Sequence, residues 1–290
     1  MKIVRSLTQM RRLVQAVKRR GQRVGFVPTM GAFHDGHLSL MRRARRETDC
    51  VVVSLFVNPT QFGPQDDFTR YPRPFARDAR LARSVGADYL FCPTARAMYP
   101  SNYATYVTVA DLSDVLCGRS RPGHFRGVAT VVLQLFNIVQ PDVAYFGEKD
   151  CQQVTIIERM VRDLHVPIRI VRLPIVREPD GLAMSSRNQY LRPRERLAAR
   201  VLSQALRVAR RLLLDGERRS DRLVARVRST IQREPLARVE YVDAVDARTL
   251  ERGTRLAGPT LIALAVRIGS TRLIDNTVVD VPEFRRPRKT

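Results

Sequence analysis

Two histidines, His34 and His37, have the type and spacing needed to bind phosphate. They stand three residues apart at the start of a segment with helical spacing, directly after an apolar run and the turn 29–32. Residues 24–46 therefore predict a strand, a tight turn and a helix N-terminus, whose unpaired N–H groups and dipole attract anions. Each imidazole can donate an N–H to a phosphate oxygen. The alternative is a solvated surface pair, and a metal site would need further ligands nearby.

Lys149 is the second candidate, because it is the only lysine between positions 19 and 288. Only four of the 51 basic residues are lysines, so arginine is strongly favoured in this chain. A lysine that persists in such a composition suggests that a compact ammonium group is needed. It follows an apolar run at 143–146 and Gly147, with Asp150 as the expected N-cap of a helix that runs to residue 164. If the two strands are neighbours, Lys149 lies beside the histidines.

Three further polar groups fall in loops after expected strands. Gln61 follows the apolar run 51–57, and ligands of open α/β sheets bind at the carboxyl ends of strands. Gln153 lies three residues after Asp150, on the same helix face. The hydroxyls and guanidinium of the triplet Ser185-Ser186-Arg187 suit phosphate oxygens. Taken singly, Gln61 is equally well a turn residue, and the triplet is better explained as surface loop.

The elements that must position these residues alternate between strand and helix up to about residue 175, which predicts an α/β domain with a parallel sheet. A helix capped by Ser6 opens the chain, and a Gly and charge cluster at 121–126 precedes a helix at 128–139. From Pro193 the order changes to helices followed by strands, which predicts a separate, smaller α+β domain. The expected domains are 1–175 and 176–290. The expected strands are 24–27, 51–57, 89–92, 105–109, 143–146 and 168–173, then 239–245, 260–266 and 272–279, and the later helices are 194–215 and 221–233.

The net charge of +23 prompts a nucleic-acid hypothesis, but the arginines are spread along the whole chain and over helix faces. The low aromatic content, without any Trp, offers few stacking platforms for single strands, so no nucleic-acid partner is predicted. No apolar run has the length of a membrane span, and the first residues lack the apolar core of a secretory signal. Four scattered cysteines without a C-x-x-C pair favour reduced thiols, and a cytoplasmic location is expected.

Four stretches taken together and in order resemble the pantoate–β-alanine ligase (pantothenate synthetase) family, within the HIGH-motif nucleotidylyltransferase superfamily. One motif alone would indicate only the superfamily, whereas four in register are specific. The resemblance extends from about residue 2 to Asn276. The motifs are Pro28-Thr29-Met30-Gly31 with His34-Asp35-Gly36-His37, residues 56–63, residues 146–153 and residues 180–188, and the segment 272–276 fits as well.

The resemblance implies a Rossmann-like N-terminal domain that binds nucleotide and pantoate, with a smaller C-terminal lid domain. It implies that pantoate attacks the α-phosphorus of ATP to give pantoyl adenylate and pyrophosphate, and that β-alanine then displaces AMP. It places pantoate on Gln61 and Gln153, and β-alanine near Gln61. The catalytic residues that it implies are His37 as proton donor, His34, Lys149, Ser185, Ser186 and Arg187. The ATP-binding residues are Met30, Gly31, His34, His37, Gly147, Lys149, Asp150, Val176, Met184, Ser185, Ser186 and Arg187.

Mg²⁺ is expected with ATP, and a homodimer is implied by the resemblance alone. Arg77 precedes Asp78 where an acidic pair would be expected beside the metal, so no protein ligand to Mg²⁺ is predicted. Two alternatives differ in their chemistry. A plain adenylyltransferase would release pyrophosphate without any amine, and a nucleic-acid-binding protein would lose affinity steeply with salt.

Overall fold

The structure is a computed structural model that describes residues 1–64 and 66–281. Gln65 and residues 282–290, which include the basic tail of the expected C-terminal domain, lie outside the described residues. The chain divides into two compact units. Unit 1 comprises Met1–Asp114, Arg121–Val176 and Met184–Ser186, and unit 2 comprises Val115–Ser120, Arg177–Ala183 and Arg187–Thr290.

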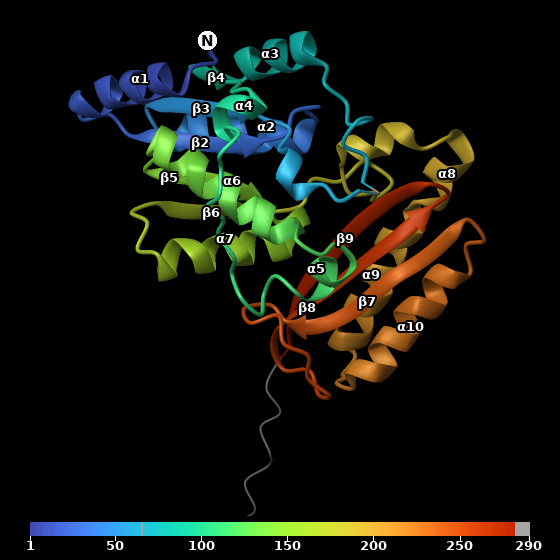
Figure 1. The fold of residues 1–290 in the computed structure, drawn as a ribbon. Coiled ribbons are helices and arrows are strands. Elements are labelled where there is room, and N and C mark those ends of the chain that lie inside the picture. The colour runs from blue at the N-terminus through green and yellow to red at the C-terminus, as the bar shows by residue number, and fades with distance from the viewer. Residues whose placement is uncertain (65, 282–290) are drawn as a thin grey trace, which may run out of the picture. The chain divides into compact units, whose positions relative to one another are not determined.

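Unit 1 is built on a six-stranded parallel sheet of order β1-β4-β3-β2-β5-β6, which confirms the predicted α/β class (Figure 1). The central strands are runs of buried Val, Phe and Leu, as expected for a parallel sheet covered on both faces. Strand β2 lies between β3 and β5, so the three strands that precede the predicted site loops are neighbours. The strands are β1 Lys2–Val4, β2 Val24–Thr29, β3 Cys50–Leu55, β4 Tyr89–Phe91, β5 Val143–Gly147 and β6 Arg169–Leu173.

Helices cover the two faces of this sheet because successive strand residues point to opposite sides. Val27 packs in one core with Met41 of α2 and Ala82 of α3. Its neighbour Phe26 faces the other side, where its ring lies 6.3 Å from that of Phe136 of α6. Helices α1 and α7 pack against α6. The helices of unit 1 are α1 Leu7–Arg19, α2 Asp35–Glu47, α3 Phe75–Ser84, α4 Ala95–Met98, α6 His124–Val139 and α7 Cys151–Asp163, with 3₁₀ turns η1 Pro59–Gln61 and η2 Glu148–Asp150.

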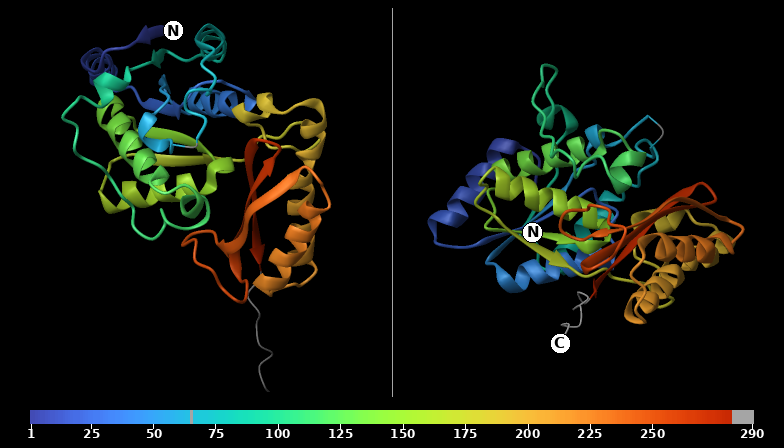
Figure 2. Two further views of the ribbon diagram at one scale, coloured as in Figure 1. Left: turned by 45° about the vertical axis from the view of Figure 1, so that its right-hand side comes forward. Right: turned by 90° about the horizontal axis from the view of Figure 1, so that it is seen from below.

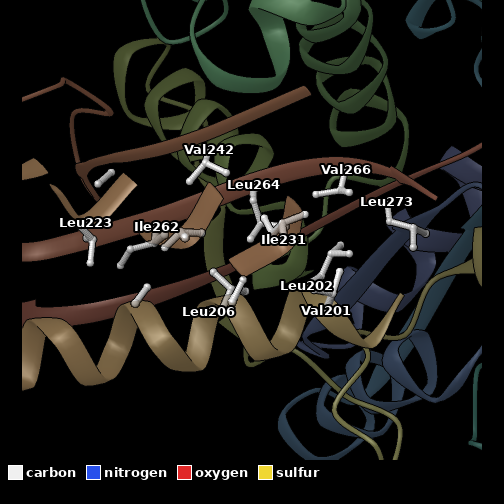
Figure 3. Packing of buried hydrophobic residues seen from close by; sticks show 14 of the residues in the cluster. Val201, Leu202, Leu206, Leu223, Ile231, Val242, Ile262, Leu264, Val266 and Leu273 are labelled. Carbon is white, nitrogen blue, oxygen red and sulfur yellow. The ribbon is translucent and has the colours of Figure 1, made fainter. Parts of the chain in front are cut away.

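Unit 2 is a three-stranded antiparallel sheet, β7-β8-β9, with helices α9 and α10 along one side (Figure 2). Its core joins Leu202 and Leu206 of α9 and Ile231 of α10 to Ile262 and Leu264 of the central strand (Figure 3). This arrangement confirms the predicted smaller α+β region. The elements are α5 Leu116–Ser120, η3 Ser186–Tyr190 (which begins in unit 1), α8 Pro193–Ala198, α9 Arg200–Leu214, α10 Ser220–Gln232, β7 Ala237–Asp246, β8 Gly258–Ile268 and β9 Thr271–Val281.

Three element predictions were wrong. Residues 105–109 form no strand, and the Val107 N–H donates to the Thr130 hydroxyl of α6 at 2.9 Å instead of joining a ladder. The long helix expected at 194–215 is broken at Ala199, because the Leu202 N–H bonds the carbonyl of Ala199 and tightens the turn. Helix α6 begins four residues before Val128, after Gly123 in the left-handed region (φ 78°). None of the helices within the described residues is long and apolar enough to cross a membrane.

Candidate active site

The turn after β2 is held in place by a buried carboxylate from α3. Gly31 and Ala32 both have positive φ, 89° and 52°, which costs energy for a residue with a side chain. Asp78, completely buried, accepts hydrogen bonds from the Ala32 N–H at 2.7 Å and the Phe33 N–H at 2.9 Å. Burial raises the pKa of Asp78 although these two bonds favour the charged form. The carboxylate therefore fixes the path of the chain into α2.

His34 and His37 lie together at the N-terminus of α2, as predicted. His34 is the N-cap residue, and its N–H donates to His37 Nδ1 at 3.4 Å. The two ring centroids are 4.1 Å apart. Because Nδ1 accepts this bond, the neutral His37 ring carries its proton on Nε2. Burial, then the charges of His34 and Lys149, hold the pKa of His37 well below its ordinary value, so the ring is neutral at pH 7.

Lys149 reaches this histidine pair because β5, the strand before it, pairs with β2. It lies on the 3₁₀ turn η2, close enough to His37 for its charge to lower that pKa. Its ammonium is 3.7 Å from the Asp150 carboxylate, and its side chain is 20% exposed. Asp150 does occupy the N-cap position of α7, but its side chain makes no capping bond, because the preceding 3₁₀ turn gives it a non-extended backbone (φ −99°, ψ 56°).

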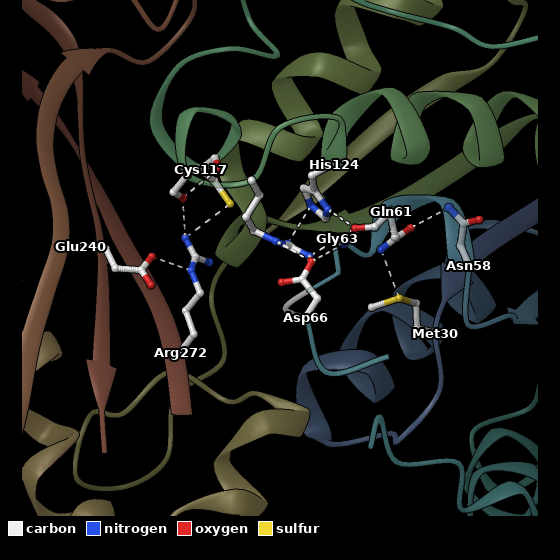
Figure 4. A network of polar contacts seen from close by, with 11 residues as sticks. Met30, Asn58, Gln61, Gly63, Asp66, Cys117, His124, Glu240 and Arg272 are labelled. Carbon is white, nitrogen blue, oxygen red and sulfur yellow. Dashed lines mark hydrogen bonds and ion pairs between the residues drawn. The ribbon is translucent and has the colours of Figure 1, made fainter. Parts of the chain in front are cut away.

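Gln61 is buried on η1, and its amide faces the turn after β2. Its Nε2 donates to Met30 Sδ at 3.1 Å, and its Oε1 accepts from Asn58 Nδ2 at 3.0 Å (Figure 4). Asn58 Nδ2 also donates to the Gly127 carbonyl of α6 at 3.1 Å, and its Oδ1 accepts from the Tyr99 hydroxyl at 2.8 Å. The loops after β2 and β3 therefore meet at the same edge of the sheet, as the parallel strand order requires.

Gln153 lies on the first turn of α7 and is half-buried. Its neighbour Gln152 is buried, and its Nε2 donates to the Leu112 carbonyl at 2.9 Å. Gln152 therefore holds a loop of unit 1, whereas Gln153 is only half-buried.

The fourth predicted stretch is divided between the two units. In unit 1, the Met184 N–H donates to the Val176 carbonyl at 3.0 Å, and the Ser186 hydroxyl lies 3.2 Å from the Tyr71 hydroxyl. Ser185 belongs to the same short segment of unit 1, whereas Arg187 belongs to unit 2. The structure therefore brings the histidines, Lys149, Met30 and Gln61 to one edge of the sheet of unit 1. Arg187 belongs to unit 2.

Residues of the motif at 272–276 form ion pairs within unit 2. Asp275 is buried and forms a bidentate ion pair with Arg177, at 2.7 and 3.0 Å. Arg272 pairs with Glu240 at 2.7 Å and donates to Cys117 Sγ at 3.7 Å (Figure 4). None of the four cysteines, all of which lie within the described residues, forms a disulfide bond.

The described residues do not form a metal cage. No group of three or more His, Cys, Asp or Glu side chains among residues 1–64 and 66–281 is placed to hold a metal ion. The Asp78 carboxylate, which lies beside the site, is already bound by two backbone N–H groups. The donor set thus does not fit a Mg²⁺ ion held by protein groups alone.

Comparison with known proteins decides the family. The model of the family described as "Pantoate-beta-alanine ligase" matches residues 2–278. A curated pantothenate synthetase from Heliobacterium modesticaldum is 58% identical, covering 97% of this chain and 100% of that protein. The chain belongs to the pantoate–β-alanine ligase family. It is an enzyme of that family, and the resemblance drawn from the four motifs is confirmed.

Solved structures of pantoate–β-alanine ligases share the fold. Pantothenate synthetase from Thermus thermophilus superposes with a TM-score of 0.91 at 44% identity, covering 97% of this chain and all of that one. The ligase from Francisella tularensis, complexed with beta-gamma ATP and β-alanine, gives a TM-score of 0.79 at 34% identity, covering 96% and 97%.

Several residues that shape this ligase's site were missed from the sequence. Asp78 was noted only as a carboxylate beside Arg77, because nothing local shows that α3 turns it toward the β2 turn. Asn58 lies inside the motif 56–63 but was not singled out as a site residue, and Tyr71 carried no spacing signal. The cluster at 121–126 did stand out by its charge and glycine, but none of its residues was assigned a role; Arg121 and His124, which belong to it, contact the Gln61 carbonyl.

Proposed function

We propose that this chain condenses pantoate with β-alanine in an ATP-dependent reaction, through a pantoyl-adenylate intermediate, releasing pyrophosphate and AMP. Its family membership supports the overall reaction. The observation that carries the assignment to this site is the histidine pair at the N-terminus of α2 beside Lys149 from the neighbouring strand. Such an arrangement offers N–H donors, a helix dipole and an ammonium to one set of phosphates.

In the first step a pantoate carboxylate oxygen forms a bond to the α-phosphorus of ATP, and the bond to pyrophosphate breaks. Negative charge then collects on the leaving group, where Lys149 would neutralise it and the Nε2–H of His37 would donate a hydrogen bond to a phosphate oxygen. His34, at the N-cap, would bind the same phosphates. Because His37 is held neutral with its proton on Nε2, it can donate a hydrogen bond to the phosphates, but a neutral imidazole is too weak an acid to transfer that proton.

In the second step the amine of β-alanine attacks the acyl carbon, and the bond between that carbon and the AMP oxygen breaks. Gln61 and Gln153 are proposed to hold pantoate through this step, with Gln61 also near β-alanine. The contact between Gln61 and Met30 supports this placement, because it sets the pantoate loop against the nucleotide loop.

The remaining nucleotide contacts are proposed on the same basis. The Val176–Met184 hydrogen bond and the position of Ser186 beside Tyr71 support a shared role for this segment. Because the donor set gives Mg²⁺ no protein-only site, the metal is proposed to accompany ATP on its phosphates, and no step is assigned to it. The proposed ATP-binding residues are Met30, Gly31, His34, His37, Gly147, Lys149, Asp150, Val176, Met184, Ser185, Ser186 and Arg187.

A product assay tests the reaction. Protein, ATP, Mg²⁺ and pantoate are incubated with and without β-alanine, and AMP, pyrophosphate and pantothenate are followed. We expect sustained AMP only when both pantoate and β-alanine are present, with one pantothenate per AMP. Pyrophosphate release that ignores β-alanine would instead favour a plain adenylyltransferase.

We further propose a cytoplasmic homodimer in which residues 176–290 act as a lid over the catalytic domain 1–175. Four cysteines without a disulfide support a reducing compartment, and the dimer and the lid rest on the family resemblance. Sedimentation at micromolar concentration is expected to give a dimer, and a monomer alone would contradict it.

A further inference from the structure

The backbone carbonyl of Gln61 is held by two side chains from the start of α6. His124 Nδ1 lies 2.8 Å from this oxygen, and Arg121 Nη2 lies 3.3 Å from it (Figure 4). His124 is on the first turn of α6, and Arg121 precedes that turn. Neither residue has been assigned a role above, yet both bear on the residue proposed to hold pantoate.

The partners of His124 determine which of its nitrogens carries the proton. The Gln61 carbonyl can only accept, so His124 Nδ1 must donate to it. Arg121 Nη1 lies 3.1 Å from His124 Nε2, and a guanidinium can only donate, so Nε2 must accept. The ring is therefore the neutral Nδ1–H tautomer, and a protonated ring would turn an N–H toward Arg121.

Arg121 bonds both the Gln61 carbonyl and the Asp66 carboxylate. Its Nη2 donates to the Asp66 carboxylate at 2.8 Å, and the same carboxylate oxygen accepts from the Gly63 N–H at 2.8 Å. The side chains of Arg121 and Asp66 are 14% and 23% exposed, so solvent competes little for these bonds. Gln61, Gly63 and Asp66 are thus joined by a chain of charged and neutral hydrogen bonds.

The close approach of α6 leaves the η1 turn little room to move. A Cβ on Gly127 would lie 2.4 Å from the Thr60 carbonyl oxygen and 2.7 Å from the Gln61 nitrogen, so only glycine fits there. Asn58 adds its bond to the Gly127 carbonyl. The N-terminal turn of α6 is therefore the surface against which Gln61 is set.

We propose that His124, supported by Arg121 and Asp66, is a positioning residue for pantoate: its Nδ1–H orients the Gln61 backbone so that the amide side chain points at the substrate. The proposal rests on the proposed function, in which Gln61 binds pantoate. His124 itself touches no reacting atom. Loss of its bond removes one of the contacts that fix the Gln61 backbone and weakens pantoate binding, while nucleotide binding at the β2 turn is left intact.

The groups that face His124 keep it in the required form. Burial is the largest cause that lowers the pKa of His124, and the positive charge of Arg121 lowers it further. The bond to Gln61 and the charges of Asp150 and Asp66 act in the opposite direction, and the resulting pKa is about 4. Burial raises the pKa of Asp66, but its bonds from Arg121 and Gly63 bring it below the ordinary value. At pH 7 the histidine is neutral and the aspartate is charged, as the hydrogen-bond pattern requires.

Three variants of His124 separate this role from general stability. His124→Ala removes the donor, His124→Asn keeps an N–H near the Nδ1 position, and His124→Gln places its amide near Nε2 instead. His165→Asn, an exposed histidine just after α7, is the matched control. We expect His124→Ala and His124→Gln to raise the KM for pantoate about tenfold, the effect of one lost hydrogen bond, with the KM for ATP unchanged. His124→Asn should recover most of this loss.

A spectroscopic measurement tests the tautomer without any activity. The chain has four histidines, so ¹⁵N-histidine NMR of the wild type and of His124→Asn assigns the His124 ring by difference. We expect a neutral ring protonated on Nδ1 at pH 7. A ring protonated on Nε2, or charged at pH 7, would overturn the proposal.

The kinetic outcomes are equally decisive. The proposal fails if folded His124→Ala keeps the wild-type KM for pantoate, if both KM values rise together, or if His124→Asn is no better than His124→Gln. A wild-type protein that forms no pantothenate would instead refute the proposed function, and the NMR result would still report on the hydrogen bond.

Discussion

Replacing His124 by asparagine should remove a pH-dependent part of the stability of unit 1. The ordinary pKa of a histidine is 6.5, and in the folded protein burial and the Arg121 charge lower that of His124 to about 4. Between these values the unfolded chain binds a proton that the folded protein does not. The free energy of unfolding is therefore greatest above pH 6.5 and is lost as the pH falls toward 4.

The size of the effect follows from these two values. At pH 7 the unfolded histidine is mostly neutral, so the linkage costs only a few tenths of a kcal/mol. At pH 5 the unfolded histidine is almost fully protonated and the folded one is not, which lowers the free energy of unfolding by about 2 kcal/mol relative to pH 7. The His124→Asn protein has no ring to titrate at this position and is spared this loss.

Urea unfolding at pH 7 and pH 5 measures the difference. His34, His37 and His165 are present in both proteins, so their contributions cancel when the pH-dependent loss of wild type is compared with that of His124→Asn. We expect the wild type to lose about 2 kcal/mol more between the two pH values. An equal loss in the two proteins would show that His124 titrates normally when folded, and would refute the reasoning from burial and Arg121.

Three other substitutions test the site. Lys149→Ala should cut turnover by roughly 10²–10³ because an ammonium beside His37 is lost; Lys2→Ala is the control, and near-normal turnover in folded Lys149→Ala would exclude the role. Asp78→Ala leaves two buried N–H groups without an acceptor and should lower the free energy of unfolding by about 2–5 kcal/mol, as measured by urea titration. The control Asp280→Ala, at an exposed position, should not show this loss. Gly127→Ala should lower the melting temperature rather than raise it, since the new Cβ meets the Thr60 carbonyl; an increase would show that the backbone yields freely.

The parts of the fold that follow from local pattern were predictable from the sequence. Buried β-branched runs indicated the strands, and the Ser6 cap was confirmed by its bond from the Gln9 N–H at 3.3 Å. The turn into α2 was predicted because glycine, histidine and helical spacing occur together within a few residues. The same reasoning failed at 105–109, where an alternating segment finds a hydroxyl of α6 instead of a neighbouring strand.

The tertiary contacts of the site were not predictable from local pattern. That β5 would lie beside β2, and so bring Lys149 to His37, depends on the strand order rather than on any residue near either motif. Asp78 stabilises a turn 46 residues earlier in the chain, and His124 contacts Gln61 across 63 residues. Such pairs carry no signal in a single sequence, because each partner is ordinary in its own neighbourhood.

The division of the chain into interleaved units limits how this enzyme can be cut. The chain passes from one unit to the other after residues 114, 120, 176, 183 and 186. A fragment ending near residue 175 would therefore lose Met184–Ser186 from unit 1 and would carry Leu116 and Cys117, buried side chains of unit 2, as exposed apolar surface. A fragment that starts there would lack α5, which packs against β7. Neither unit can be prepared intact by one break, because each consists of three segments that alternate along the chain.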